Sequence, residues 1–450
     1  MDIFDTTLGD EITRVINNAK GSGIFIDAVV HAGEHDIEVL KVLNMDNFED
    51  YINNYTGETK ISLLISSGKV ALKVIPYKDQ LEISLKLSTA NIITGSYDGE
   101  TPINVERFRA VLVESEDTAA QSQGREIKDE FTMDIGDLEV VEFQLFSKAV
   151  EQLMLRSCGG SYRKTAKPDL IKALLLQETQ NIDVDQEYMP KGVDMVEPPD
   201  TAPREHIVIP HGTPVTDAPG YIHKHCGGVY PAGLSYFYKN DFWYVFPTYD
   251  YTRYQEADKN LVILQVPPNK IPDIEFTYLK ESSVLTILTT GDSLMQDQSE
   301  AQALTEGNGS RYSDAGSLFQ NTATIKDNKV VVSRNSNNNE FVSTQRKAGF
   351  NNVTTSSNRI TSNSMYEASK LAARKGSRIQ VVWENSEPSL IVPGMQAKFL
   401  YFKEGQVKEL KCVVVGIESS MIWTGKGIVQ GRHDRQTAIS LFAENLVKND

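Results

Sequence analysis

Residues 227–268 read GGVYPAGLSYFYKNDFWYVFPTYDYTRYQEADKNLVILQVPP, and between Tyr236 and Tyr254 they carry ten of the 38 aromatic side chains in the chain. Two runs typical of β-strands, Ser235–Lys239 and Phe242–Phe246, flank Asn240-Asp241, a pair typical of a two-residue hairpin turn. Aromatic side chains pair well across neighbouring strands and bury a large area each. The stretch therefore predicts a hairpin whose rings form part of a core.

A hairpin this rich in aromatic rings can also serve as a binding platform for bases or sugars. Lys239 and Arg253 are the basic residues that interleave with these rings, whereas platforms for nucleic acids combine rings with many basic residues. A nucleic-acid platform is therefore disfavoured. The interpretations that remain are a buried core, which we favour, and a carbohydrate platform, whose rings would have to be exposed.

The length of 450 residues predicts more than one domain, because single hydrophobic cores stop growing at about 250–300 residues. No apolar run approaches the ~18 residues of a membrane helix, and the acidic residues 1–5 lack the basic start of a signal peptide. Three cysteines lie far apart in the sequence, at Cys158, Cys226 and Cys412. This spacing argues against a disulfide framework and favours synthesis in a reducing cytoplasm.

The formal net charge of −16 is distributed unevenly along the chain. Residues 1–150 carry −14, residues 151–300 carry −8 and residues 301–450 carry +6. Proteins that grip nucleic-acid phosphates use Lys and Arg to displace counterions, so an acidic surface binds phosphate backbones poorly. The acidic excess predicts a solvated surface that serves solubility, or a surface that repels phosphates.

The first part of the chain, residues 12–146, has the pattern of an all-β region. Apolar and polar residues alternate there, which places one face of a strand in a core and the other in solvent. Three such stretches are Leu81, Ile83, Leu85 and Leu87; Val141, Phe143 and Leu145; and Val70, Leu72 and Val74 after a Ser67-Gly68 turn. Several strands with short turns predict a barrel or a sandwich, with a polar loop at residues 114–130.

The middle of the chain has a mixed pattern. Pro168 and Asp169 suit the first turn of a helix that continues to residue 177. Residues 187–204 are rich in proline and acids and predict an extended connector. A second short helix is expected at residues 218–226, ended by Gly227 before the aromatic hairpin.

The last part returns to strands around a polar insertion. Of residues 335–363, 17 of 29 are Asn, Ser or Thr, a composition that buries little surface and predicts long loops or irregular edge strands. A helix follows, with a capping box of Ser364 and Glu367 and a stop at Gly376. Strands are predicted on both sides of this region, at residues 261–266, 275–280, 284–290, 379–383, 398–402, 410–415 and 438–442.

No motif in the sequence specifies a reaction. A metal site among His206, His211, His223, His225 and Cys226 is disfavoured, because His223 and His225 are two apart on a predicted helix and point away from each other. Residues 307–309 read Gly-Asn-Gly but lack the strand and the lysine of a phosphate loop, and no Gly-x-Ser-x-Gly elbow occurs. A pair of glycosidase carboxylates is possible in so acidic a chain, but nothing singles one out.

Several loose motifs, spread over most of the chain, carry a resemblance to a known family. They lie in the acidic β-rich start through residues 76–77 and 81–87, and in residues 141–153, 210–229, 243–247, 381–383 and 390–394. In their order they resemble the central baseplate hub proteins of contractile-tailed bacteriophages, which are related to the hub part of type VI secretion spikes. The polar insertion departs from that pattern.

The resemblance implies a mainly β chain with α+β insertions. Residues 1–146 would form a first tail-tube-like β-barrel, and residues 147–254 a mixed α/β domain with the aromatic hairpin. Residues 255–290 and 376–450 would form a second tube-like β-barrel, and residues 291–375 a polar insertion that ends in a helix. The two β regions would then be copies of one barrel.

The resemblance also implies a structural role in the tail baseplate of a virion. A homotrimer would join the sixfold tail tube protein to the threefold central spike protein, contact other baseplate proteins and line a channel through which DNA passes without specific binding. No catalytic, cofactor-binding or metal-binding residues, and no cofactor, are expected. The alternatives are a host- or carbohydrate-binding tail protein that uses the aromatic hairpin and, with less support, a cell-wall hydrolase.

Within the hub interpretation, part of the acidic excess of residues 1–150 is expected to line the DNA channel. Acidic side chains repel phosphates over about a Debye length, roughly 8 Å at physiological salt. In the predicted barrel, every second residue of a strand faces away from the core. Glu82 and Glu142 occupy such positions and are candidates for the channel wall.

Overall fold

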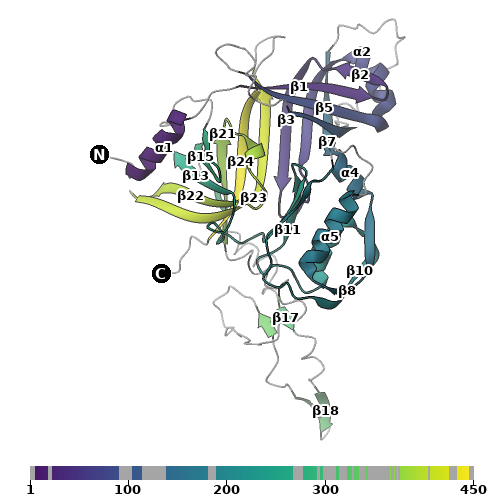
Figure 1. The fold of residues 1–450 in the computed structure, drawn as a ribbon, viewed down its shortest axis with the longest axis vertical. Helices are drawn as coiled ribbons and strands as arrows, with labels where there is room; N and C mark the ends of the chain where they lie inside the picture. The colour runs from purple at the N-terminus through teal and green to yellow at the C-terminus, as the bar shows by residue number, and fades with distance from the viewer. Residues whose placement is uncertain are drawn as a thin grey trace.

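Strands dominate the described part of the chain, and the prediction of a mainly β protein with α+β insertions is confirmed (Figure 1). The computed structural model describes residues 6–18, 23–90, 104–113, 138–180, 189–266, 277–290, 294–296, 311–313, 322–326, 329–333, 340–342, 365, 369, 372, 376–403, 406–424 and 433–444.

One large mixed sheet runs through both β regions of the sequence. Its N-terminal strand set is β1 (Gly23–Ala32), β3 (Lys41–Asp50), β4 (Glu58–Ser66), β5 (Leu81–Ala90), β6 (Asn104–Leu112) and β7 (Leu138–Ser147), with β2 (His35–Glu38) beside β1. Its C-terminal strand set is β13 (Asn260–Val266), β14 (Tyr278–Lys280), β15 (Val284–Thr290), β16 (Leu294–Gln296), β21 (Gly376–Glu384) and β22 (Gln396–Lys403). The long strands β23 (Gln406–Trp423) and β24 (His433–Glu444) connect the two sets.

The N-terminal strand set curls into a circuit. Consecutive antiparallel pairings lead from β1 through β5, β6, β7 and β4 to β3. β3 then pairs with β23, β23 with β24, and β24 returns to β1 through a single residue pair, Ile24 with His433. With one pair at its last junction the circuit is not a fully closed barrel, but it encloses fully buried Val30, Leu63 and Phe143.

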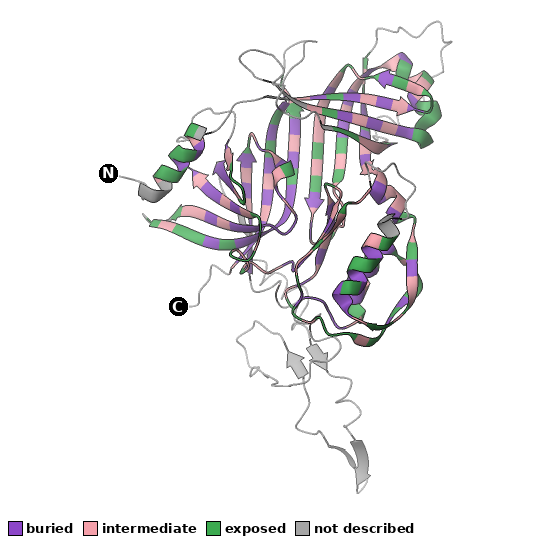
Figure 2. Cartoon of the chain, in the orientation of Figure 1, coloured by how far each residue is buried: buried purple, intermediate pink, exposed green. Residues whose placement is uncertain are grey.

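Alternation of apolar and polar residues explains why these strands curl around a core (Figure 2). Leu81, Ile83 and Leu85 of β5 are fully buried, whereas Glu82 and Ser84 between them point to the other face. The alternation predicted for β5 and β7 is therefore confirmed.

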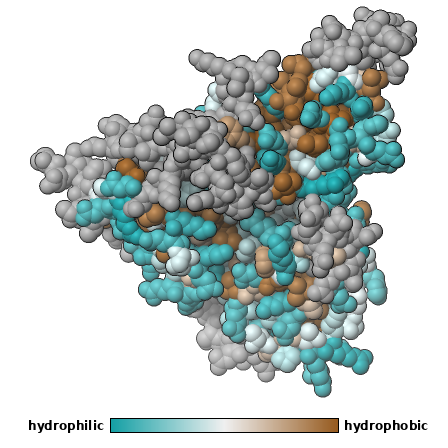
Figure 3. Space-filling view, turned by 45° about the horizontal axis from the view of Figure 1, so that its top comes forward, coloured by the Kyte–Doolittle hydropathy of each residue, from teal (hydrophilic) through white to brown (hydrophobic). Residues whose placement is uncertain are grey.

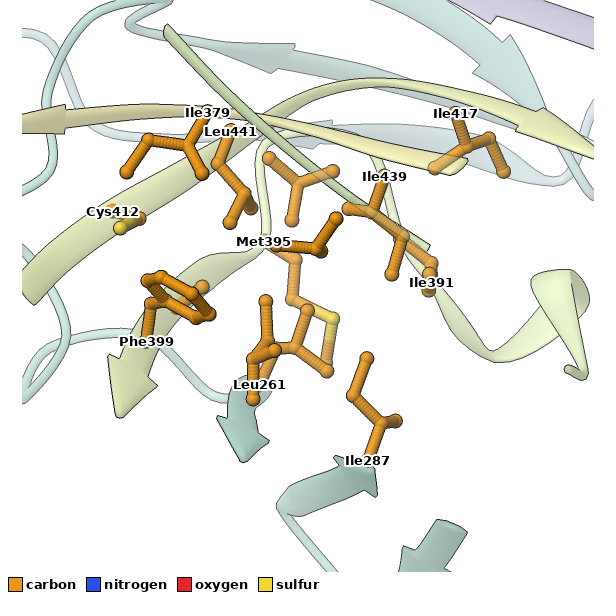
Figure 4. Close-up of a cluster of buried hydrophobic side chains, with 14 of the residues drawn as sticks. Leu261, Ile287, Ile379, Ile391, Met395, Phe399, Cys412, Ile417, Ile439 and Leu441 are labelled. Atoms are coloured by element: carbon orange, nitrogen blue, oxygen red, sulfur yellow. The ribbon is translucent and has the colours of Figure 1, made fainter. Parts of the chain in front are cut away.

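The C-terminal strand set encloses a second core. β13 lies between two parallel partners, β15 and β22, while β21, β23 and β24 are antiparallel. Figure 4 shows side chains from all these strands pointing toward one another, among them Leu261, Ile287 and Phe399. Trp383 of β21 is fully buried there, and its Nε1 donates a hydrogen bond to Thr277 Oγ1 at 2.7 Å.

A mixed part lies between the two strand sets in the sequence and beside the N-terminal set in space (Figure 1). Its helices are α4 (Lys148–Met154), α5 (Lys167–Gln180) and α6 (Ala218–His225). Its strands are β8 (Ser157–Thr165) with β10 (Arg204–Pro214), and β11 (Ser235–Lys239), β12 (Phe242–Phe246) and β9 (Gly192–Met195). These elements share a third core, so both helices and the hairpin predicted here are confirmed.

Two predictions for the first region are wrong. Residues 67–74, expected as a turn and a strand, form helical turns (Ser67–Lys69 and Val70–Val74), and a third helical turn follows (Ile75–Gln80). Val70 and Val74 are buried while Leu72 is exposed, so the spacing that mattered was four residues along a helix. Helix α1 (Thr6–Asn18) also begins the chain, where residues 12–18 were assigned to the all-β region.

Elsewhere the differences are in extent. β9 lies inside the predicted connector, and β23 extends well beyond residues 410–415. Short strands β17 (Arg311–Ser313), β18 (Thr322–Lys326), β19 (Lys329–Ser333) and β20 (Glu340–Val342) pair within the insertion. The loop at 114–130, the Gly-Asn-Gly triplet and the cap residues Ser364 and Glu367 lie outside the described residues. The four-part division into domains remains a prediction.

Candidate interaction surfaces

The aromatic hairpin is a core element. Phe237 and Trp243 are 1% and 0% exposed, and they belong to two different cores, one on each side of the hairpin. Phe237 packs edge-on against Tyr51 of the N-terminal half, with ring centroids 4.7 Å apart. The turn residues Asn240 and Asp241 have φ of 51° and 63°, as a two-residue hairpin turn requires. With these rings buried, the hairpin does not present them as a carbohydrate platform.

A buried ion pair fastens the end of this hairpin to the N-terminal strand set. Lys239 Nζ lies 2.8 Å from Glu49 Oε2, and the two side chains are 9% and 6% exposed. The Tyr51 hydroxyl donates a hydrogen bond to Glu49 Oε2 at 2.7 Å, and Asn47 Nδ2 donates one to Glu49 Oε1 at 2.9 Å. Burial and then the Glu49 charge raise the pKa of Tyr51, so its hydroxyl remains a donor. We call these residues the hairpin joint.

A second polar cluster lies under the glycine pair that precedes the hairpin. Lys167 is fully buried, and its Nζ is 3.0 Å from Asp200 Oδ2 and donates to the carbonyl of Gly228. Arg204 contacts the same carboxylate at 2.9 Å. Burial alone would raise the pKa of Asp200, but hydrogen bonds from Lys167 and Ala202 outweigh burial and lower it. The cluster therefore holds an ionised carboxylate that connects α5, the connector and the glycine loop.

His223 supports the same loop. Gly227 and Gly228 have φ of 98° and 79°, a left-handed region that favours glycine, and the next amide, Val229 N–H, donates to His223 Nδ1 at 2.9 Å. Burial, followed by the nearby Lys167 charge, lowers the pKa of His223 to about 4. The imidazole is therefore neutral at pH 7 and acts as a hydrogen-bond acceptor.

The other residues considered for a metal site are dispersed. His225 packs on Tyr221 with ring centroids 4.6 Å apart, while His206 and His211 are exposed on β10. Cys226 caps the end of α6. Within the described residues, no group of three or more His, Cys, Asp or Glu side chains is arranged to hold a metal ion.

The two candidates for a channel wall differ in their surroundings. Glu82 forms ion pairs with Arg107 at 2.5 Å and Lys148 at 2.9 Å. Burial would raise the pKa of Glu82, but Lys148 and Arg107 lower it, so the charge is present and compensated. Glu142 is exposed on the outer face of β7. Glu142 is thus the better placed of the two to repel phosphates.

The outer face of the sheet is hollowed where the two strand sets meet. Two pockets of about 250 and 520 Å³ share Phe48 and Glu418 and lie across β3, β23, β24 and β21. Phe48 is 44% exposed, and the remaining lining is mostly polar, including Asp46, Ser420 and Gln436. The floor of this hollow is the shared sheet itself.

Large apolar side chains are exposed mainly on the N-terminal half, and apolar atoms gather on that part of the surface (Figure 3). In the described part of the chain, residues 23–147 supply nine of the fourteen exposed large apolar residues, which are Leu40, Phe48, Leu72, Ile75, Tyr77, Val105, Val111, Leu138 and Val140. Apolar surface of this kind is typical of faces that another protein covers.

Sequence reasoning missed the residues that hold the parts together. No spacing in the sequence signals that Lys239 pairs with Glu49, 190 positions away, or that Asp200 pairs with Lys167, 33 positions away. Lys167 precedes Pro168 at the helix start, but that position does not predict burial. Within the described residues, no helix combines the length and apolarity needed to cross a membrane.

No family model and no curated protein sequence matches the chain. Solved structures do match it. A tail protein from Neisseria meningitidis aligns over 93% of this chain and 96% of its own, at 11% identity and a TM-score of 0.42. A 43 kDa tail protein of a Shewanella oneidensis prophage aligns over 92% and 98%, at 9% identity and a TM-score of 0.45. A type VI secretion system component from Escherichia coli aligns over 93% and 77%, at 8% identity and a TM-score of 0.42.

The structural neighbours are thus phage tail proteins and type VI secretion proteins. At these identities and TM-scores the similarity concerns the path of the chain. A function for this chain has to come from its own residues.

Proposed function

We propose that the chain is the structural hub of a bacteriophage contractile-tail baseplate, a non-enzymatic protein of the virion. In this role three copies join a sixfold tail tube to a threefold central spike. The observation that carries the proposal is the presence of two strand sets with separate cores, connected by β23 and β24 within one chain. Three chains would then offer six strand sets to the tube while keeping threefold symmetry toward the spike.

Exposed apolar surface supports assembly with other proteins. Val111, Leu138 and Val140 are 45%, 49% and 53% exposed on the N-terminal half. Monomeric proteins rarely leave contiguous apolar patches uncovered, and uncovered sheet faces favour association. A neighbouring copy, the tube, the spike or another baseplate protein would cover this face in the assembled tail.

The hub would also line the channel for DNA. An acidic wall does not bind phosphates, because binding requires Lys and Arg to release counterions. The −14 charge of residues 1–150 fits a wall that DNA slides past. Replacing several outward acids of the N-terminal half by Lys should slow DNA ejection without preventing assembly. Unchanged ejection would mean that the acidic charge serves solubility.

Analytical ultracentrifugation and cryo-electron microscopy test the assembly directly. The chain, alone or with its spike protein, is expected to form a threefold species, and an image of the particle should place it between tube and spike. A strict monomer or a hexameric ring in the native particle contradicts the proposal. Zymography on cell-wall material provides the control for enzymatic function, because clearing by the pure chain would favour a hydrolase.

A further inference from the structure

A histidine lies between a carboxylate and a hydroxyl on the outer face of the N-terminal strand set. His31 Nδ1 is 2.6 Å from Asp36 Oδ1, and His31 Nε2 is 2.8 Å from Ser84 Oγ. The three side chains come from the neighbouring strands β2, β1 and β5. We call this group the serine relay. Neither the proposed assembly nor the channel wall uses it.

The directions of these two hydrogen bonds follow from the chemistry of the groups. A carboxylate can only accept, so the hydrogen of the neutral His31 ring lies on Nδ1 and is donated to Asp36. His31 Nε2 then carries a lone pair and accepts from the Ser84 hydroxyl. A hydroxyl bonded to a basic ring nitrogen, with the other ring nitrogen held by a carboxylate, is the arrangement that activates a serine as a nucleophile.

The sheet fixes the geometry of the serine relay. His31 and Asp36 are register partners across the β1–β2 hairpin. Ser84 is the register partner of Val29, two residues from His31 on the same face, so the histidine ring reaches it diagonally across the strands. All three side chains point outward, because the residues next to them in each strand are buried in the core: Val30, Ile37 and Ile83.

Small molecules can reach the relay, and positive charge lies beside it. The His31 side chain is 18% exposed, and Ser84 is partly exposed. Arg107 of β6 is the register partner of Ser84. Arg107 and Lys148 of α4 both pair with Glu82, so one carboxylate compensates only one of two cations. The remaining positive charge favours the oxyanion that forms when a hydroxyl adds to an ester carbonyl.

We propose that Ser84 is a nucleophile that hydrolyses small activated esters through an acyl-serine intermediate. Ser84 Oγ bonds to the acyl carbon while its proton moves to His31 Nε2, and the leaving group departs with that proton as an alcohol. Water then adds to the acyl carbon in the same way, which releases the carboxylic acid and returns the proton to Ser84 Oγ. Asp36 is a positioning residue. The activity is additional to the hub role, so either proposal can fail alone.

Two reagents test the proposal on the full chain. A fluorophosphonate should phosphonylate Ser84, and mass spectrometry of the digested protein locates the label. With p-nitrophenyl acetate, p-nitrophenol should be released faster than in buffer, and Ser84→Ala and His31→Gln should each lower that rate at least about tenfold. Absence of the label from Ser84 in the parent chain would overturn the proposal, even if a variant failed to fold. So would an unchanged rate in folded Ser84→Ala.

Further variants test the positioning residue and provide a control. Asp36→Asn should lower kcat about tenfold with KM and Tm unchanged, because Asp36 is 77% exposed and only orients His31. Asp36→Glu, which keeps the carboxylate, should recover part of kcat. Ser62→Ala removes a partly exposed serine of β4 that lies outside the relay, and it should retain both label and rate. An unchanged kcat in Asp36→Asn, or lost activity in Ser62→Ala, would contradict the relay.

Discussion

Lys239 shows how a single side chain can hold two parts of this molecule together. It extends from the end of β11 to Glu49 of β3, and it also donates to the carbonyl of Pro388 at 3.4 Å. Glu49 and Tyr51 depend on this cation, because both are buried in the same network. Removing one member of a buried ion pair leaves the other charge without compensation.

Lys239→Met is therefore expected to lower the free energy of unfolding by about 3–5 kcal/mol. Lys191→Met is the matched control. Lys191 pairs with Asp241 at the same hairpin turn but is 60% exposed, so its loss should cost about 0–1 kcal/mol. Urea unfolding of both variants measures the difference, and equal effects would refute the role of the hairpin joint.

Trp243 separates the core interpretation from the platform interpretation. Trp243→Ala should destabilise the chain by about 3–5 kcal/mol, because the side chain is fully buried among Tyr236, Tyr238 and their neighbours. Trp243→Phe should cost less, since the Trp243 Nε1 has no hydrogen-bond partner to lose. Thermal melts measure both, and a variant with an unchanged Tm and lost carbohydrate binding would restore the platform interpretation.

His223 makes stability depend on pH. The pKa of His223 in the folded chain is about 4, below the ~6.5 of an exposed histidine. Between these two pH values the imidazole is protonated in the unfolded chain and neutral in the folded chain. Above pH 6.5 His223 does not change the free energy of unfolding with pH. As pH falls from 6.5 to 4, it should lower the free energy of unfolding by up to about 3 kcal/mol. In His223→Gln, whose amide oxygen can still accept from Val229, that part of the pH slope should disappear in unfolding titrations.

At the scale of elements, the turn that leads into β22 packs closely against strand β12 of the aromatic hairpin, and this close approach requires a glycine at position 394. Gly394 has φ of 72°, and a Cβ there would lie 2.3 Å from the Phe246 ring of β12. Gly394→Ala adds backbone strain and a steric clash inside a core. We expect it to lower the free energy of unfolding by about 3 kcal/mol or more.

Gly212 gives the matched control for this prediction. It has φ of 85°, but a Cβ there meets nothing within 4 Å. Gly212→Ala should therefore show only the backbone cost of about 1–2 kcal/mol. The difference between the two variants measures the contact between the turn and the hairpin, and equal costs would mean that no such contact limits the turn.

At the scale of the molecule, exposed apolar strand residues should matter for assembly and not for folding. Val111→Lys with Val140→Lys changes two outward side chains of β6 and β7. The variant should keep the Tm of the parent chain but lose the threefold species in sedimentation. Val208→Lys, which alters an equally exposed residue on β10, is the control and should assemble normally. Normal assembly of the double variant would exclude this face from the interface.

Most of the secondary structure could be predicted from local patterns in the sequence. Period-two alternation predicted β5 and β7, the Asn240-Asp241 turn and its aromatic flanks predicted the hairpin, and Pro168 marked the start of α5. Such signals depend on near neighbours in the chain, so they can be read without a fold. The same reasoning misassigned Val70 and Val74, because a short apolar spacing suits a strand as well as a helix.

The tertiary structure decided how these elements combine. β23 and β24 join both strand sets into one sheet, because β23 pairs with β3 and β24 pairs with β1, in each case between residues more than 360 positions apart. The hairpin joint and the Lys167–Asp200 pair likewise arise from residues distant in sequence. Burial strengthens the interactions of these polar groups, because the interior has a low dielectric constant. Whether a group is buried depends on how the cores assemble, so no local sequence pattern predicts it.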